Sequence, residues 1–182
     1  MTSSMAEQNK RVAALIDSIR RSFPVVRYTG DVTQFDARLD DPDFYDVKPD
    51  PDLADFWDEK ELRDAFKGRG WTEVPRNLLF RHPDGYVLLT DQAFVAFLPA
   101  WLMCSLEGMD EENEVRNFLA YAFSNTLRQF QILNPEQRVT VRSILAEFVE
   151  RGTGSSVRNL LTKTIVFIDD LDCHPFHGTK LT

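Results

Sequence analysis

Cysteine is scarce in this chain, since its 182 residues include only Cys104 and Cys173. Two cysteines cannot supply a disulfide framework or a four-cysteine zinc site. Unpaired cysteines are typical of a reducing compartment, and neither the polar residues 1–8 nor the charged stretch after them has the pattern of a secretion signal. We therefore expect a cytoplasmic protein.

Long apolar runs and catalytic signatures are also missing. The most apolar run, residues 93–106, has 14 residues, whereas a helix that spans a bilayer needs roughly 20. None of the eight glycines belongs to a phosphate-binding loop, and no serine or cysteine lies in the context of a nucleophile elbow. The sequence therefore predicts no membrane-spanning segment and offers no complete catalytic motif.

What the chain does have is a local excess of acidic residues. Its net charge is −8, from 21 basic and 29 acidic residues. Residues 31–64, which we call the acidic segment, hold 13 acidic and four basic residues, a net charge of −9, so the remainder carries +1. A negative field of this kind repels nucleic acid and anionic lipid and attracts cationic surfaces. We therefore expect a basic protein partner, with no direct nucleic-acid partner and no membrane partner.

Most of the chain has the apolar periodicity of helices. The pattern predicts helices over residues 6–22, 52–67, 90–106, 112–130 and 135–151. Residues 157–168 favour a helix, with a strand at 165–168 as the alternative. The 90–106 helix is apolar on nearly every side, so we expect it to be central and buried, with Pro99 kinking or restarting it.

Two helix starts have explicit capping signals. Thr90 is expected to cap the central helix. Asn134 and Gln137 flank Pro135 and Glu136 in the pattern of a capping box with proline at the first helical position.

One stretch favours β-structure. Asp84-Gly85 between two short apolar runs is a hairpin signal, and His82, just before the turn, is expected to be solvated. The predicted fold class is mainly α (α+β at the margin), a compact helical domain with one β-hairpin around residues 78–89. We expect a single globular domain over residues 1–182, in which residues 1–24 form an N-terminal amphipathic helix and residues 25–53 an acidic, proline-containing ordered loop.

Metal chemistry has three weak candidates. Pro49-Asp50 followed by Asp58-Glu59-Lys60 superficially fits metal-dependent nucleases, but a chance match is favoured because the second half lies in a predicted helix with acidic surroundings. The Asp-x-Asp pairs at 41/43 and 50/52 lack the glycine and glutamate of an EF-hand. Cys173, His174 and His177 have zinc-compatible side chains near the end of the sequence. We expect no metal and no cofactor, and Cys104 is expected to be a core residue.

The acidic segment is interleaved with aromatic residues, and this favours a binding surface over a merely solvated face. Acidic side chains steer and surround a basic partner, while aromatic side chains anchor it. The candidate partner-binding residues are Asp40, Asp41, Asp43, Phe44, Tyr45, Asp46, Asp50, Asp52, Asp55 and Asp58.

Four stretches carry a resemblance to a known family. They are residues 55–57, 71–75, 88–94 with 97–106, and 133–137. Together they resemble a family of small, mostly helical bacterial proteins catalogued only as a domain of unknown function, over about residues 50–150. The resemblance implies a compact helical domain and a bacterial source, and it transfers no catalytic residue.

These observations predict a non-enzymatic, acidic protein-binding module. More specifically, we expect an immunity or inhibitor protein that masks a basic bacterial toxin, such as a nuclease effector. One alternative is a metal-dependent enzyme that uses the acidic segment or the Cys173/His174/His177 cluster. The other alternative is a small scaffold or adaptor protein.

Overall fold

The computed structural model describes residues 5–33, 54–83, 85–107, 127–151 and 154–173, and this part of the chain is mostly helical. Its α-helices are α1 (Met5–Ser22), α3 (Ala54–Phe66), α4 (Arg76–Arg81), α5 (Asp91–Glu107), α7 (Pro135–Glu150) and α8 (Ser155–Cys173). Short 3-10 helices are η3 (Trp71–Glu73), η4 (Gly85–Leu88) and η5 (Leu127–Ile132). None of the helices among these residues is long and apolar enough to cross a membrane.

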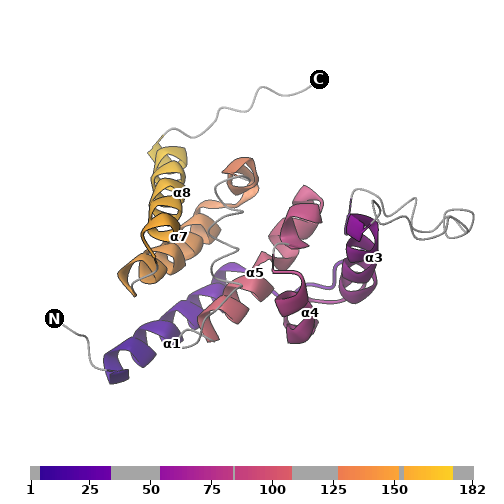
Figure 1. Cartoon of the computed structure of the whole chain (residues 1–182), viewed down its shortest axis with the longest axis horizontal. Coiled ribbons are helices and arrows are strands. Elements are labelled where there is room, and N and C mark those ends of the chain that lie inside the picture. Colours follow the sequence, from indigo (N-terminus) through magenta and orange to yellow (C-terminus); the bar gives the residue numbers. More distant parts are fainter. Residues whose placement is uncertain (1–4, 34–53, 84, 108–126, 152–153, 174–182) are drawn as a thin grey trace, which may run out of the picture.

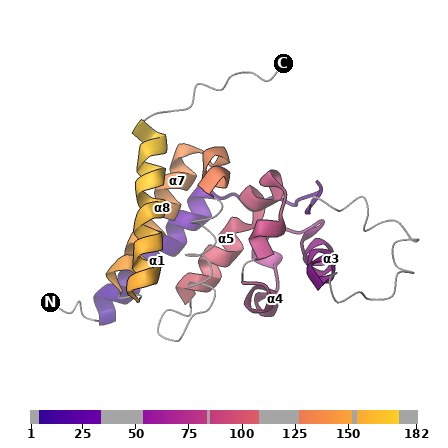
Figure 2. The ribbon, with the colours of Figure 1, turned by 45° about the horizontal axis from the view of Figure 1, so that its top comes forward.

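Helix α5 lies in the middle of the molecule, as its sequence predicted. Figures 1 and 2 show it between α1, α7 and α8 on one side and α3 and α4 on the other. The Thr90 hydroxyl accepts the Ala93 N–H at 3.2 Å, which confirms the predicted cap. The helix includes Pro99 in its interior, and its buried residues point in nearly every direction around its axis. Because it contributes to both sides of the core, α5 joins the two groups of helices.

The first group is a bundle of α1, α7 and α8. The capping box at α7 is confirmed, because the Gln137 N–H donates to Asn134 Oδ1 at 2.9 Å and the Asn134 N–H donates to Gln137 Oε1 at 3.0 Å. Residues 157–168 lie within α8, so the strand alternative is wrong. Hydroxyl contacts from Ser18 and Ser22 to Thr140 join α1 to α7.

The second group is built around α3 and α4. Phe66 of α3 stacks on Phe97 of α5, with ring centroids 4.5 Å apart, and meets the Trp101 ring edge-on at 5.5 Å. Helix α3 ends where predicted, and Gly68 adopts a positive φ of 77°, a conformation that a glycine reaches without strain. The packing of Phe66 and Leu62 in the core fixes which side of α3 faces outward.

The predicted β-hairpin at residues 78–89 is wrong. Those residues form α4, a turn closed by the Gly85 N–H and the His82 carbonyl, and then η4, and no strand occurs in the described ranges. Leu78 and Leu79 are adjacent and both buried, an arrangement that a helix end against α5 accommodates and an alternating strand does not. Leu89 instead makes an isolated antiparallel bridge with Thr33.

Two other predicted segments are only partly described. Residues 25–33 are non-helical, as predicted, and are tied to the core because the Tyr28 N–H donates to the Arg69 carbonyl and the Tyr28 ring meets Phe97 edge-on. The rest of the predicted loop, residues 34–53, lies outside the described residues. So does most of the predicted 112–130 helix, whose last part falls in η5.

Candidate functional site

Most of the predicted partner-binding residues lie outside the described part of the chain. These residues are Asp40, Asp41, Asp43, Phe44, Tyr45, Asp46, Asp50 and Asp52. The backbone of Asp55 and Asp58 is described, and both belong to α3. Because they are three residues apart on one helix, they are neighbours along the same side of α3.

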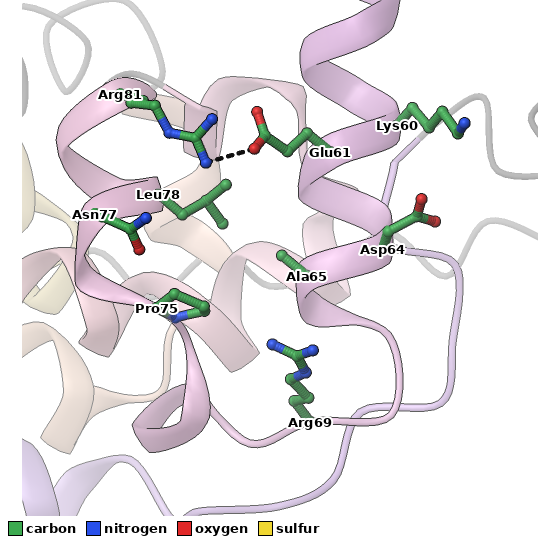
Figure 3. A pocket seen from close by; sticks show the side chains of 9 residues that line it. All are labelled: Lys60, Glu61, Asp64, Ala65, Arg69, Pro75, Asn77, Leu78 and Arg81. Carbon is green, nitrogen blue, oxygen red and sulfur yellow. Dashed lines mark ion pairs between the residues drawn. The ribbon is translucent and has the colours of Figure 1, made fainter.

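The same helix forms one wall of a groove, with α4 as the other wall (Figure 3). The groove, which we call the α3–α4 groove, has a volume of about 610 Å³. Its lining residues are Lys60, Glu61, Asp64, Ala65, Arg69, Pro75, Asn77, Leu78 and Arg81. A volume of this size is within the range of small-molecule sites. The groove combines polar side chains with an apolar surface from Ala65, Pro75 and Leu78.

Glu61 lies at one end of the groove and binds two other side chains. Its Oε1 lies 2.5 Å from the Arg81 guanidinium, and its Oε2 accepts the His82 Nε2–H at 2.8 Å. The hydrogen bond from His82, followed by the hydrogen bond and charge of Arg81, lowers the pKa of Glu61 below its ordinary value. Glu61 is therefore a carboxylate that links α3 to the end of α4.

The expectation that His82 is solvated is wrong. Its exposed fraction is 9%, and its backbone carbonyl accepts the Trp101 Nε1–H at 3.2 Å. The imidazole therefore holds Glu61 from the core side, while Arg81 reaches the same carboxylate from the surface. This pairing has no local signal in the sequence, because 21 residues separate Glu61 from His82.

Arg69 lies at the other end of the groove. Figure 3 shows its guanidinium pointing into the space between α3 and α4, whereas Lys60 and Asp64 point away from that space. Asp64 instead accepts from Arg63, at 3.0 Å. No carboxylate among the described residues pairs with Arg69. The charged lining therefore includes a Glu61–Arg81 pair, Asp64 paired with Arg63, Lys60, and Arg69, which has no counterion among the described residues.

A second, smaller cavity of about 180 Å³ lies between η3, α4 and α5. Cys104 borders it and is buried, as predicted, and this burial raises the pKa of its thiol. Arg76 and Glu107 form an ion pair among the residues that line the cavity. A buried thiol with a raised pKa is a poor nucleophile, so this geometry indicates a packing role for Cys104.

The ligand side chains of all three predicted metal candidates lie outside the described part of the chain, so these candidates stay predictions. Cys173 is the last residue of α8, and His174 and His177 lie outside the described ranges. Where side chains are described, no group of three or more histidine, cysteine or acidic residues is placed to hold a metal ion.

No family model, curated protein or solved structure matches the chain. The resemblance of residues 50–150 to a family of helical bacterial proteins therefore stays a prediction.

Proposed function

We propose that the chain is a non-enzymatic, acidic protein-binding module, an immunity or inhibitor protein that masks a basic bacterial toxin. The observation that carries this proposal is the distribution of charge. Residues 31–64 hold a net charge of −9 together with five aromatic residues, while the remainder of the chain holds +1. A concentrated field of one sign accelerates encounter with a partner of the opposite sign, and aromatic side chains supply the buried contacts.

The end of the acidic segment is anchored by α3. Leu62 and Phe66 of this helix are both fully buried. The side chain of Glu61 is 38% exposed and that of Asp64 is 56% exposed, so these carboxylates meet solvent. A rigid attachment of this kind limits the conformational entropy that the segment loses when a partner binds.

Several bases outside the acidic segment pair with acids that are also outside it. Arg142 pairs with Asp169, Arg151 with Glu147 and Arg76 with Glu107. These arginines therefore leave the charge of the acidic segment uncompensated. Arg81, which binds Glu61, is a described base from outside the segment that does compensate it.

We also propose a cytoplasmic location, because the buried thiol of Cys104 persists most easily in a reducing compartment. There the chain would meet its basic partner and cover the partner's cationic surface. No reaction by this chain is needed for such inhibition.

Affinity capture from the native host tests the proposal. The baits are the full chain, the variant D40N/D41N/D43N/D46N, and a control variant, D17N/E107Q/E150Q/D170N, which removes the same number of charges from exposed positions outside the segment. We expect the full chain and the control to retain one basic protein that the acidic-segment variant loses. A retained partner that is acidic, or that all three baits bind equally, would contradict the proposal.

Metal analysis of the purified, untagged chain tests the alternative of a metal-dependent enzyme. The proposal predicts substoichiometric metal after gel filtration, since weak acidic clusters do not hold an ion through dilution. One tightly bound ion per chain would favour the enzyme instead.

A further inference from the structure

The backbone around Arg69 is fixed by hydrogen bonds to two other segments. The Gly68 N–H donates to the Tyr28 carbonyl at 2.7 Å, the Arg69 N–H donates to the Phe66 carbonyl at 3.0 Å, and the Arg69 carbonyl accepts the Tyr28 N–H at 3.0 Å. Arg69 thus projects from a turn held on both sides. A side chain on such a turn is better preorganised for binding than one on a free loop.

The charge within the groove is positive although its surroundings are acidic. The lining holds Lys60, Arg69 and Arg81 against Glu61 and Asp64, and the two acids are paired, Glu61 with Arg81 and Asp64 with Arg63 (Figure 3). This leaves Arg69, a half-buried residue, without a counterion among the described residues. A partly desolvated guanidinium has five N–H donors in a fixed plane, and a carboxylate satisfies two of them at once.

The rest of the groove is suited to an apolar group. Leu78 and Pro75 come from the α4 side and Ala65 from α3, and Asn77 adds an amide that can donate or accept (Figure 3). The volume of about 610 Å³ exceeds what a lone inorganic ion would fill. The lining therefore fits a molecule that combines one anionic group with an apolar body.

We propose that the α3–α4 groove binds a carboxylate ligand with an apolar body, with Arg69 as the bidentate donor. Leu78, Pro75 and Ala65 contact the apolar body, and Asn77 contributes one polar contact. A monocarboxylate is favoured over a phosphate because a single unpaired arginine faces the groove and the acidic segment repels additional negative charge. The carboxylate belongs either to a small organic acid or to the C-terminus of a peptide.

Titration of the full chain with N-acetyl-leucine, followed by NMR, tests this site. The probe has a dozen non-hydrogen atoms, so we expect a dissociation constant in the low millimolar range. The work is done at about 0.15 M salt, where the Debye length is about 8 Å and repulsion by distant acids is screened. Amide signals of residues 65–69 and 76–81 should shift with saturation. N-acetyl-leucinamide, which lacks the charge, should leave them unchanged.

Substitutions of Arg69 separate this site from general surface binding. Arg69→Gln should weaken binding by roughly ten- to a hundredfold, and Arg69→Lys should weaken it less because the charge remains without the planar fork. Arg20→Gln removes an exposed arginine elsewhere and should change nothing. Matching circular dichroism and melting curves confirm that each variant is folded.

The outcomes distinguish the two ligand sources. A tighter constant for N-acetyl-Ala-Ala-Leu than for N-acetyl-leucine would support the site and identify a peptide C-terminus. Equal constants would support the site and identify a small organic acid. Shifts that fail to saturate, equal binding of the leucinamide, or unchanged binding by Arg69→Gln would overturn the proposal.

Discussion

The bundle of α1, α7 and α8 and the group of α3 and α4, which we call the edge, both contain an acidic residue bound by two basic side chains. The two acidic residues differ in how far their side chains are exposed. In the bundle, Glu147 accepts from Arg151 Nε at 2.7 Å and lies 3.9 Å from Arg11, with 9% of its side chain exposed. At the edge, Glu61 binds Arg81 and His82 with 38% of its side chain exposed.

The surroundings of the two acids differ as well. Arg11 reaches Glu150 at 2.8 Å, and Arg151 also donates to the Gln8 carbonyl, so the charges of the bundle satisfy one another. Beside Glu61 lies an open groove with Arg69 left over. The charges of the bundle therefore join its helices, while the edge has an arginine without a counterion among the described residues.

The packing of aromatic residues tests whether the two regions fold together. Phe66 at the edge and Phe148 in the bundle are both fully buried. We expect Phe66→Ala and Phe148→Ala each to lower the free energy of unfolding by about 3–5 kcal/mol, because each leaves a cavity. Urea denaturation followed by circular dichroism measures both. A single shifted transition is expected for each variant, and a separate early transition in Phe66→Ala would show that the edge unfolds independently.

Neutralisation of the two acids sharpens the comparison. Glu147→Gln leaves Arg151, whose side chain is only 13% exposed, without its charged partner, so we expect a loss of about 1–3 kcal/mol. Glu61→Gln removes a more exposed pair and should cost less than about 1 kcal/mol. Urea denaturation at pH 7 compares them. Equal losses would mean that Glu61 and Glu147 contribute equally to the free energy of unfolding.

The helix cap at Asn134 of α7 provides a reference against which the losses in the free energy of unfolding can be compared. Asn134→Ala removes an acceptor for the Gln137 N–H, so we expect a loss of about 1 kcal/mol. The same urea measurement applies, and Asn134→Gly, which loses only a few tenths, is the matched control. A loss above 2 kcal/mol would indicate that Asn134 does more than cap the helix.

Lowering the pH should slightly reduce the stability that the pairing of Glu61 contributes at the edge. Because the pKa of Glu61 is lowered from its ordinary value of 4.5, the folded state holds this proton less tightly than the unfolded state does. The resulting stability is present above pH 4.5 and is lost as the pH falls through the lower folded value. The free energy of unfolding, measured with urea between pH 6 and pH 3, should therefore fall by less in Glu61→Gln than in the parent chain. The difference should be below about 1 kcal/mol. An identical pH dependence would show that the pairing of Glu61 contributes nothing to stability.

The sequence predicted the parts of the fold that depend on neighbouring residues. The Thr90 cap, the Asn134 capping box and the end of α3 before Gly68 are local features, and all are confirmed. The hairpin failed because Asp84-Gly85 carries a turn signal while the flanking leucines satisfy a helix packed on α5. Tertiary burial therefore decided the structure there.

The groove could not be predicted from local patterns. Arg69 comes from a turn, Glu61 from α3 and Arg81 from α4, and tertiary packing such as that of Phe66 on Phe97 brings these segments together. Gly68 did mark the turn that presents Arg69. The predicted binding residues at positions 40–52 lie outside the described residues and stay a prediction.

The dependence of the association rate on salt tests the proposed function most directly. Stopped-flow mixing with the captured partner would compare the parent chain, D40N/D41N/D43N/D46N and D17N/E107Q/E150Q/D170N across ionic strength. We predict rates near 10⁸ M⁻¹s⁻¹ at low salt for the parent chain, a steep fall as salt rises, and a similar slope for the control variant (~10⁸ is the order expected for steered association). The acidic-segment variant should be slower and less dependent on salt, because the segment keeps only part of its negative charge. Equal rates and slopes for all three proteins would contradict a docking role for the acidic segment.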